Sequence, residues 1–169
     1  QNLDRLLELA EYFLIKSEYY FLFIGRGSEV NKLKDQAIKK KLINCEFLDE
    51  VKPEEILSVY DKCYVGMISL NHNHTTHNIP GKLLSYLFSG LPVLADINPN
   101  SDLEKLIVNK SVGKVCSTNR KSDLVNQALS LISLIESDQI INIRCKNAFK
   151  DLFSTNIAAK QILKGLSTF

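Results

Sequence analysis

The residues from His77 to Val93, HNIPGKLLSYLFSGLPV, have the types and spacing of a helix that begins at an anion site. Pro80 suits the first position of a helix, because the N–H that proline lacks would have no partner there in any case. Gly81 and Lys82 follow, and no obvious capping side chain precedes them. Such a first turn offers backbone N–H donors and one ammonium group to an anion. The pattern indicates a phosphate site, although many helices begin with proline and bind nothing.

The remainder of this segment is a helix followed by a buried strand. Apolar residues recur at helical spacing at Leu83, Leu84, Leu87 and Phe88. Gly90 is expected to end the helix in a left-handed conformation, and Pro92 prevents the helix from resuming. The run Pro92-Val-Leu-Ala95 then has the continuous apolar character of a buried parallel strand.

Three histidines in the polar loop before this helix, His72, His74 and His77, have the spacing H-x-H-x-x-H. They could hold a metal ion. However, no Cys or carboxylate lies close by in the sequence, and a loop rich in Asn and Thr is a poor preformed cage. Loop histidines with at most one ligand contact are therefore favoured over a metal site.

A second candidate turn, Gly25-Arg26-Gly27, follows an aromatic run. It has the first two glycines of a dinucleotide-binding fingerprint, but Val30 stands at the position of the third. A nicotinamide cofactor is therefore not expected. The two glycines either serve only a tight strand-to-helix turn or line a loop beneath another ligand.

Composition indicates one soluble globular domain over residues 1–169, with 45% hydrophobic and 24% charged residues. A net charge of +2 is too small to indicate a nucleic-acid partner. The four cysteines lack metal-ligand spacing and are expected to be reduced thiols, which fits the cytosol. No signal peptide or membrane-spanning run is present, and the chain opens inside a helical pattern, as a piece of a longer protein does.

Strands and helices alternate along the chain. Strands are expected at 19–24, 43–48, 63–70, 92–95 and 112–117. Helices are expected at 2–17, from Ser28 as a cap to about 41, from 53, from 80 to 89, from 101 to 109, from about 124, and at 139–152 and 155–166. Because the strands are continuous apolar runs, the pattern predicts an α/β fold whose parallel sheet carries helices on both faces.

Ligands of such open sheets lie beyond the carboxyl ends of the strands. Three segments are expected there: Gly25–Gly27, Leu48–Asp49, and the loop Asn71–Lys82 with its helix. The sequence therefore predicts that they converge at one edge of the sheet.

These segments resemble a known family. The shared motifs are IGRGSE at 24–29, EFLDEV at 46–51, IPGKLLSYLFSGLPVLA at 79–95, NPNSDLEKLI at 98–107 and VGKV at 112–115. In this order they resemble the C-terminal, donor-binding half of the two-domain (GT-B) retaining glycosyltransferases of group 1 (family 4). The block around Pro80 is most similar to bacterial enzymes of polysaccharide or O-antigen assembly, including N-acetyl-L-fucosamine transferases.

The resemblance implies a Rossmann-like, doubly wound parallel sheet with a helical C-terminal segment, one half of a GT-B fold. It implies transfer of a sugar from a nucleoside diphosphate, with UDP expected by analogy, to an acceptor hydroxyl in bacterial surface polysaccharide synthesis. Neither a metal ion nor another cofactor is implied. The expected location is the cytoplasm, at the inner face of the membrane.

The family's binding residues carry over onto matching positions of this chain. Gly25, Arg26 and Gly27 would line the loop beneath the donor diphosphate, and backbone groups near Phe47 and Leu48 would meet the base. The loop His77–Asn78–Ile79 would reach the sugar and diphosphate. Residues Pro80, Gly81, Lys82 and Leu83 would offer amides and one cation to the phosphates.

The chain also departs from the family. Many members carry two glutamates flanking this helix start, and the corresponding residues here are His77 and Ser85. A Ser hydroxyl can still bind the ribose, but less strongly than a carboxylate. Members also have a central strand and a basic loop before the opening helix, and an N-terminal acceptor domain. That domain is an expected partner and the expected route to any membrane contact, so the chain alone is not expected to be catalytically competent.

Two other readings remain open at this point. A nucleotide-sugar epimerase of the same architecture would need acid and base side chains in the cleft, for which the sequence supplies few candidates. A non-catalytic nucleotide-sugar-binding or scaffold domain is favoured somewhat by the absent glutamates.

Overall fold

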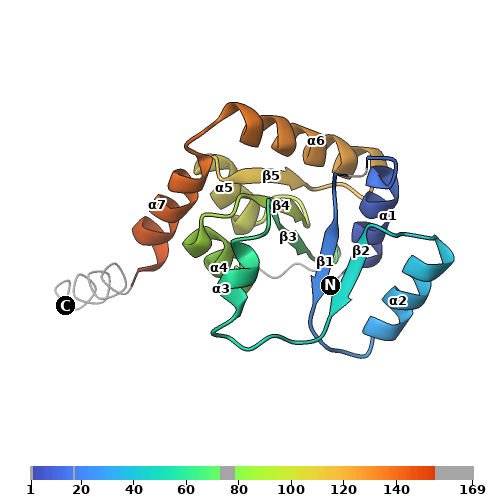
Figure 1. The fold of residues 1–169 in the computed structure, drawn as a ribbon. Coiled ribbons are helices and arrows are strands. Elements are labelled where there is room, and N and C mark those ends of the chain that lie inside the picture. Colours follow the sequence, from blue (N-terminus) through green and yellow to red (C-terminus); the bar gives the residue numbers. More distant parts are fainter. Residues whose placement is uncertain (1, 17, 73–78, 155–169) are drawn as a thin grey trace, which may run out of the picture.

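The computed structural model describes residues 2–16, 18–72 and 79–154. Helices and strands alternate through most of these residues, in the order α1 (Asp4–Phe13), β1 (Phe21–Ile24), α2 (Val30–Lys39), β2 (Cys45–Leu48), α3 (Ile56–Tyr60), β3 (Gly66–Ser69), α4 (Gly81–Ser89), β4 (Val93–Asp96), α5 (Asp102–Asn109), β5 (Gly113–Cys116), α6 (Lys121–Ser137) and α7 (Ile141–Phe153) (Figure 1). This alternation is the predicted α/β pattern. The helix expected at 155–166 lies outside the described residues.

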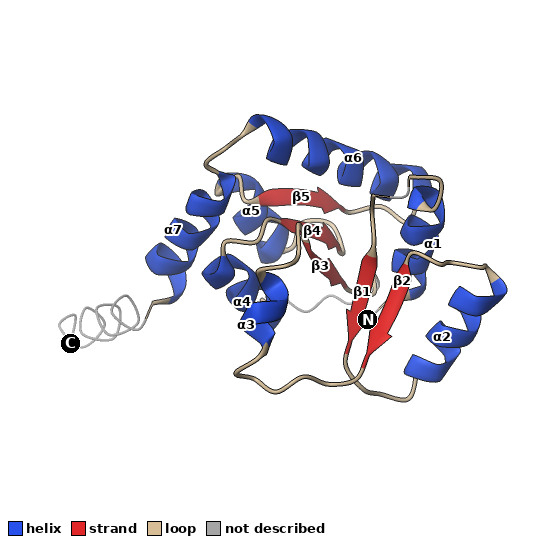
Figure 2. Ribbon diagram, in the orientation of Figure 1, coloured by secondary structure: helices blue, strands red, loops and turns tan. Residues whose placement is uncertain are grey.

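The described strands form two parallel sheets (Figure 2). One pairs β1 with β2, and Phe21 lies opposite Cys45. The other has the order β3-β4-β5, and Val93 lies between Gly66 and Gly113. The strands pair in parallel, as the sequence predicts. The described strands do not form the single continuous sheet that was also expected, because β1 is not paired with β3. The central strand that the family resemblance implies stays a prediction.

The central strand β4 is buried on both faces, which explains its uninterrupted apolar sequence. Val93 and Ala95 pack with Leu83 and Leu87 of α4, in a cluster that also includes residues of α5 and α7. The intervening Leu94 packs on the opposite face, in a cluster with residues of α1 and α6. Successive side chains of a strand point to opposite faces, so helices on both sides make this a doubly wound, Rossmann-like arrangement.

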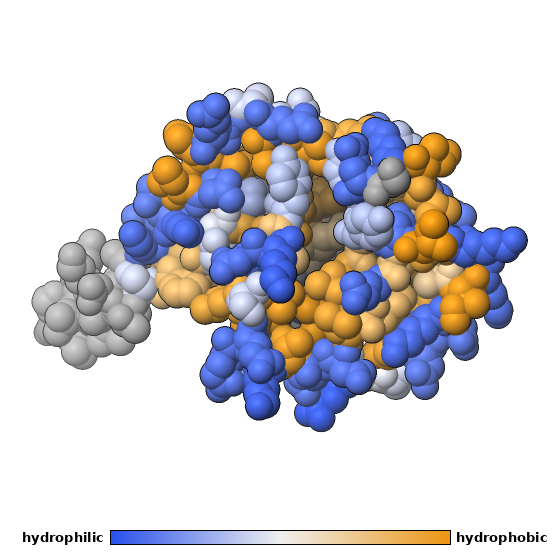
Figure 3. Space-filling model, viewed as in Figure 1, coloured by the Kyte–Doolittle hydropathy of each residue, from blue (hydrophilic) through white to orange (hydrophobic). Residues whose placement is uncertain are grey.

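Helix α1 connects the two sheets. Its residues Leu9 and Phe13 share a cluster with Leu94, and Phe21 of β1 packs against that cluster. The other side of α1 places Leu7 in a cluster with residues of α2, β1 and β2. Figure 3 shows the surface hollowed near the centre of the view, between β1 and the three-stranded sheet.

Local signals in the sequence set several helix ends correctly. Gly90 has φ of 78°, the left-handed conformation predicted for the end of α4. Ser101 caps α5 as predicted, because its side chain accepts a hydrogen bond from the Glu104 N–H at 3.1 Å. Ser28 does not cap α2: Glu29 stands at the N-cap, without a side-chain cap, and the helix begins at Val30. The predicted Ser28 cap is therefore wrong.

All four cysteines are free thiols, and Cys116 and Cys145 are buried. Burial raises the pKa of Cys145 to about 12, so this thiol stays protonated and unreactive. Among the described helices, none is both long and apolar enough to cross a bilayer.

Candidate functional site

The first turn of α4 begins one residue later than the sequence predicts, because Gly81 and not Pro80 is its first helical residue. Pro80 is the N-cap residue, with φ −64° and ψ 138°, and none of its side-chain atoms caps the helix. Leu83 and Leu87 are fully buried and hold the helix against the three-stranded sheet. A methyl group added to Gly81 would meet no atom within 4 Å, so the space beside this residue is open. The helix start is therefore rigidly supported and accessible.

The number of amides that this turn can offer is smaller than predicted. Pro80 has no N–H, and the N–H of Leu83 donates to the Pro80 carbonyl oxygen at 3.0 Å. Leu83 is therefore corrected from an anion-binding residue to one that closes the first turn and fills the core. The N–H groups of Gly81 and Lys82 precede the first acceptors inside the helix, so these two point out of its N-terminal end.

Lys82 supplies the cation of this turn. The residue as a whole is exposed, but neighbouring atoms displace enough water from its amine to lower its pKa. A positive charge that is partly desolvated gains more from an anion than one fully surrounded by water. The position therefore favours binding of a phosphate.

The turn Gly25–Gly27 lies at the carboxyl ends of β1 and β2. Gly25 and Gly27 have φ of 138° and 156°, which other residues rarely adopt, and both adjoin open space. The Gly25 N–H donates to the Leu48 carbonyl oxygen at 3.2 Å, which fixes the turn to the end of β2. Arg26 is 84% exposed and forms an ion pair with Glu50. The two predicted segments, 25–27 and 48–49, are therefore adjacent.

The other predicted residues have mixed surroundings. The Phe47 ring stacks on Phe23 with ring centroids 4.8 Å apart and is half-buried against a core cluster. Leu48 is 38% exposed. The Ser85 hydroxyl donates to the Gly81 carbonyl oxygen at 3.5 Å and keeps its oxygen as an acceptor. Ile79 is half-buried and packs against the α4 core, whereas His77 and Asn78 lie outside the described residues.

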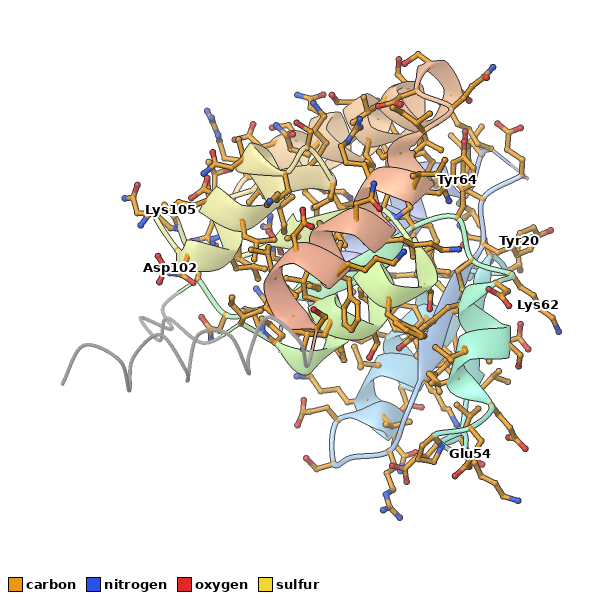
Figure 4. All side chains as sticks on the ribbon, turned by 90° about the vertical axis from the view of Figure 1, so that its left-hand side faces the viewer. Tyr20, Glu54, Lys62, Tyr64, Asp102 and Lys105 are labelled. Carbon is orange, nitrogen blue, oxygen red and sulfur yellow. The ribbon has the colours of Figure 1, made fainter. Side chains whose placement is uncertain are left out.

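Two other surface features lie at the amino ends of strands. A groove of about 590 Å³ is lined mainly by α2 and residues 41–45 at the amino end of β2. Exposed Tyr20 and Tyr64 likewise precede β1 and β3, and they lie on the same side of the molecule (Figure 4). No group of His, Cys, Asp and Glu among the described residues is arranged to hold a metal ion, and His74 and His77 fall outside them.

Sequence reasoning missed a buried ionic cluster at the carboxyl end of β4. The Asp96 carboxylate accepts hydrogen bonds from Arg5 Nε at 2.6 Å and Arg5 Nη2 at 3.1 Å. His72 Nε2 lies 2.9 Å from Asp96 Oδ1. An arginine inside the apolar stripe of α1 and an aspartate ending a buried strand were the two available signals, because buried charges require partners.

Comparisons with known proteins bear on the family and the fold of the chain. The family model described as glycosyl transferases group 1 matches residues 1–147. The chain belongs to this family. None of the curated proteins searched matches its sequence.

Solved structures of glycosyltransferases share the fold. The catalytic domain of cholesterol-alpha-glucosyltransferase from Helicobacter pylori is similar with a TM-score of 0.66 and 20% identity, over 89% of this chain and 90% of that chain. WaaG, a glycosyltransferase involved in lipopolysaccharide biosynthesis, is similar with a TM-score of 0.68 and 14% sequence identity, over 93% of this chain and 40% of the WaaG chain. AviGT4, a glycosyltransferase involved in avilamycin A biosynthesis, is similar with a TM-score of 0.51 and 16% sequence identity, over 86% of this chain and 47% of the AviGT4 chain.

Membership of the group 1 glycosyltransferases implies that the chain takes part in sugar transfer, and that a nucleotide-sugar donor and an acceptor are its partners. Within this family, the α4 start, which follows β3, and the Gly25–Gly27 turn, which follows β1, are the candidate donor-binding elements. Because β1 and β3 belong to separate sheets, their convergence at one edge stays a prediction.

Proposed function

We propose that this chain is the donor-binding part of a metal-independent retaining glycosyltransferase, and that the diphosphate of a UDP-sugar binds at the start of α4. The observation that carries the proposal is the first turn of α4, whose N-cap Pro80 gives no side-chain hydrogen bond, with Gly81 beside open space and Lys82 next to it. A diphosphate needs several N–H donors and positive charge to replace its water. Gly81 and Lys82 supply two amides and an ammonium group.

Arg26 would supply a second positive charge from the carboxyl end of β1. It follows β1 directly, on a turn whose glycines leave the backbone accessible. The backbone near Phe47 and Leu48 would face the base, and Ser85 would accept a hydrogen bond from the ribose. The loop His77–Ile79 would reach the sugar.

The chemical role of these groups is stabilisation of the leaving group. During transfer the bond between the anomeric carbon and the diphosphate oxygen breaks, and a bond forms from that carbon to the acceptor oxygen, whose proton passes to the departing diphosphate or to water. Negative charge grows on the departing diphosphate. Amides, the positive end of the helix and Lys82 interact more strongly with that growing charge than with the intact donor, which is what accelerates a reaction.

The acceptor assignment rests on similarity. The motif around Pro80 resembles bacterial polysaccharide enzymes, and WaaG, which shares the fold, is involved in lipopolysaccharide biosynthesis. We therefore propose an acceptor hydroxyl of a growing bacterial surface polysaccharide, reached together with an N-terminal acceptor domain at the inner face of the cytoplasmic membrane.

Calorimetric titration of the Lys82→Ala variant with UDP and with uridine tests the phosphate role. Loss of a charge-assisted contact is expected to weaken UDP binding at least tenfold, about 1.4 kcal/mol or more, and to leave uridine binding within about twofold. Lys105→Ala is the matched control, because Lys105 is also an exposed helix lysine and its ammonium group pairs with Asp102 on the same helix, α5. Equal losses for UDP and uridine, or an equal effect of Lys105→Ala, contradict the proposal.

A further inference from the structure

Two isoleucines at the end of α2 project from the surface beside lysines. Ile38 is 74% exposed and Ile43 is 87% exposed. A single exposed apolar side chain is ordinary, but these two line one groove together with Lys34 and Lys41. We call these four residues the α2 tip. Figure 3 shows apolar surface over the end of α2, at the right of the view, with hydrophilic groups beside it.

The turn that ends α2 fixes the isoleucines on the surface. Lys41 has φ of 54°, a left-handed conformation that ends the helix. The Leu42 N–H donates to the Ala37 carbonyl oxygen at 2.9 Å, and the Lys41 N–H donates to the Ile38 carbonyl oxygen at 3.0 Å. Ala37 and Leu42 are buried in one core cluster. Because Leu42 points into the core, Ile43 beside it is left in water.

The charge around the α2 tip is positive. The residues that line its groove include Lys34 and Lys41 and no acid. Asp35 adjoins Lys34 in the sequence but does not line the groove. Lys39 and Lys40 add positive charge on the neighbouring side, where they meet acids of α1. An anionic partner therefore complements the tip.

The apolar part of the tip narrows the choice of anionic partner. Nucleic acid has no use for exposed isoleucines, and none of the four tip residues is aromatic and able to stack on a base. A second copy placed by a two-fold axis would bring the same lysines of both copies together, which is repulsive. A bilayer with anionic headgroups satisfies both features, because apolar side chains enter the headgroup boundary while lysines meet the phosphates.

We infer that the α2 tip is a membrane-contact surface, which inserts Ile38 and Ile43 into the headgroup boundary of an anionic bilayer and places Lys34 and Lys41 against lipid phosphates. Long lysine side chains can keep their ammonium groups at that boundary while their methylene groups lie along apolar surface. Two isoleucines and a few lysines are a weak anchor, so the attachment is peripheral and reversible.

This contact is separate from the proposed donor site. The tip adjoins the amino end of β2, whereas the Gly25–Gly27 turn is hydrogen-bonded to the carboxyl end of β2. Vesicle binding is measured without UDP. A failure of donor binding therefore leaves the membrane result standing, and a failure of membrane binding leaves the donor proposal standing.

Co-sedimentation with vesicles tests the inference. The chain is mixed with vesicles of phosphatidylcholine alone, or of phosphatidylcholine with about 30% phosphatidylglycerol as the anionic lipid. We expect partitioning onto the anionic vesicles to be at least tenfold stronger, and 0.5 M salt to remove most of this difference by screening.

Two double variants separate the charged from the apolar contribution. Each lysine near an anionic bilayer is expected to change partitioning about fivefold, so Lys34→Gln with Lys41→Gln should weaken binding about twentyfold. Ile38→Ser with Ile43→Ser should weaken it about fivefold or more, because apolar surface no longer leaves water. All four positions are on the surface, and the urea midpoint checks that each variant is folded.

Matched controls keep the same changes of charge and hydrophobicity but place them elsewhere. Lys62→Gln with Lys105→Gln removes two exposed lysines that do not line the groove. Val108→Ser with Ile143→Ser removes two apolar side chains that are 56% and 57% exposed on α5 and α7. Both controls should bind anionic vesicles within about twofold of the original chain.

Each result decides for or against the inference. Equal binding to the two kinds of vesicle overturns it, as does an equal loss in the tip variants and their controls. A loss in the lysine variant without any loss in the isoleucine variant overturns the insertion of Ile38 and Ile43. Absent vesicle binding, with self-association that Ile38→Ser and Ile43→Ser abolish, would assign the tip to a second copy instead.

Discussion

Arg26 Nε lies 2.9 Å from Glu50 Oε2, so the residue after β1 is paired with a residue just after β2. Both side chains are largely exposed, at 84% and 58%, and such surface pairs contribute about 0–1 kcal/mol. Arg26 is one of the two cations proposed to meet a donor diphosphate. Glu50 therefore competes with that anion for the same guanidinium group.

The competition predicts opposite effects of two substitutions. Glu50→Gln should strengthen UDP binding by about two- to threefold, because it releases Arg26 and removes a repulsive carboxylate. Arg26→Ala should weaken binding by a similar or larger factor. Titration at low and at 0.5 M salt checks the electrostatic origin, because screening should shrink both effects. A weaker affinity in Glu50→Gln would show that Glu50 contacts the ligand favourably.

A substitution at Gly81 separates an effect on ligand binding from an effect on the stability of the fold. An alanine at this position meets no protein atom within 4 Å, and glycine inside a helix costs up to about 1 kcal/mol relative to alanine. Gly81→Ala should therefore leave the free energy of unfolding unchanged or raise it by up to about 1 kcal/mol. Because the proposed diphosphate lies against this backbone, the same variant should bind UDP several-fold more weakly.

Urea denaturation and titration of one Gly81→Ala preparation give both numbers. Gly25→Ala is the contrasting variant, since φ of 138° strains an alanine and should lower stability by about 1 kcal/mol or more. Unchanged UDP affinity in Gly81→Ala would place the diphosphate elsewhere.

The sequence predicts best those features that depend on residues close together in the chain. The helix from Gly81 to Ser89, the left-handed Gly90 and the Ser101 cap follow from residues within one turn of each other. The apolar run of β4 is buried because helices cover both faces, as its composition indicates. Strand ends were predicted too long: β1 begins at Phe21, and Tyr20 before it is 75% exposed.

Contacts between distant residues could not be predicted in this way. Arg5 and Asp96 are 91 positions apart, and their pairing depends on α1 crossing the carboxyl end of β4. Strand order has the same origin: the apolar runs of β1 and β3 look alike in sequence, and only the tertiary arrangement places them in separate sheets. The involvement of the Leu83 N–H in a bond to Pro80 depends on the exact curvature of the first turn.

The side chain of Glu11 in α1 contacts residues at the end of α2 and in α6, and we expect its contribution to the stability of the fold to be lost in acid. Its carboxylate accepts hydrogen bonds from Lys40, at the end of α2, at 2.8 Å and from Lys121 of α6 at 3.2 Å, and these contacts lower the Glu11 pKa from its ordinary value of 4.5. A lowered folded-state pKa stabilises the fold above the unfolded pKa, and this stabilisation is lost as pH falls through the folded value. Because the side chain is 40% exposed, less than about 1 kcal/mol is expected.

Urea denaturation of the original chain and Glu11→Gln between pH 7 and pH 3 measures this contribution. The original chain should be the more stable at pH 7, and the difference should shrink below about pH 4.5. Glu54→Gln, an exposed acid after β2, should show a smaller difference at every pH. A difference that grows on acidification would contradict the assignment.

Lys82 predicts a pH dependence of anion binding. Partial burial lowers its pKa below 10.5, and a bound phosphate should raise the pKa again by pairing with the ammonium group. At pH values below the free-state pKa, Lys82 is protonated in both states and affinity should be constant. Above that pKa the free protein must take up a proton to bind, so UDP affinity should fall by up to tenfold per pH unit.

Replacement of Lys82 by arginine tests this without removing the positive charge. Arg keeps its proton up to about pH 12, so the affinity of Lys82→Arg for UDP should stay flat over the range in which the original chain weakens. Titrations above pH 7.5 avoid the second ionisation of the terminal phosphate, whose pKa is about 6. Parallel pH profiles for the two proteins would mean that the Lys82 ammonium does not pair with the diphosphate, and the cation of the site would then have to be Arg26.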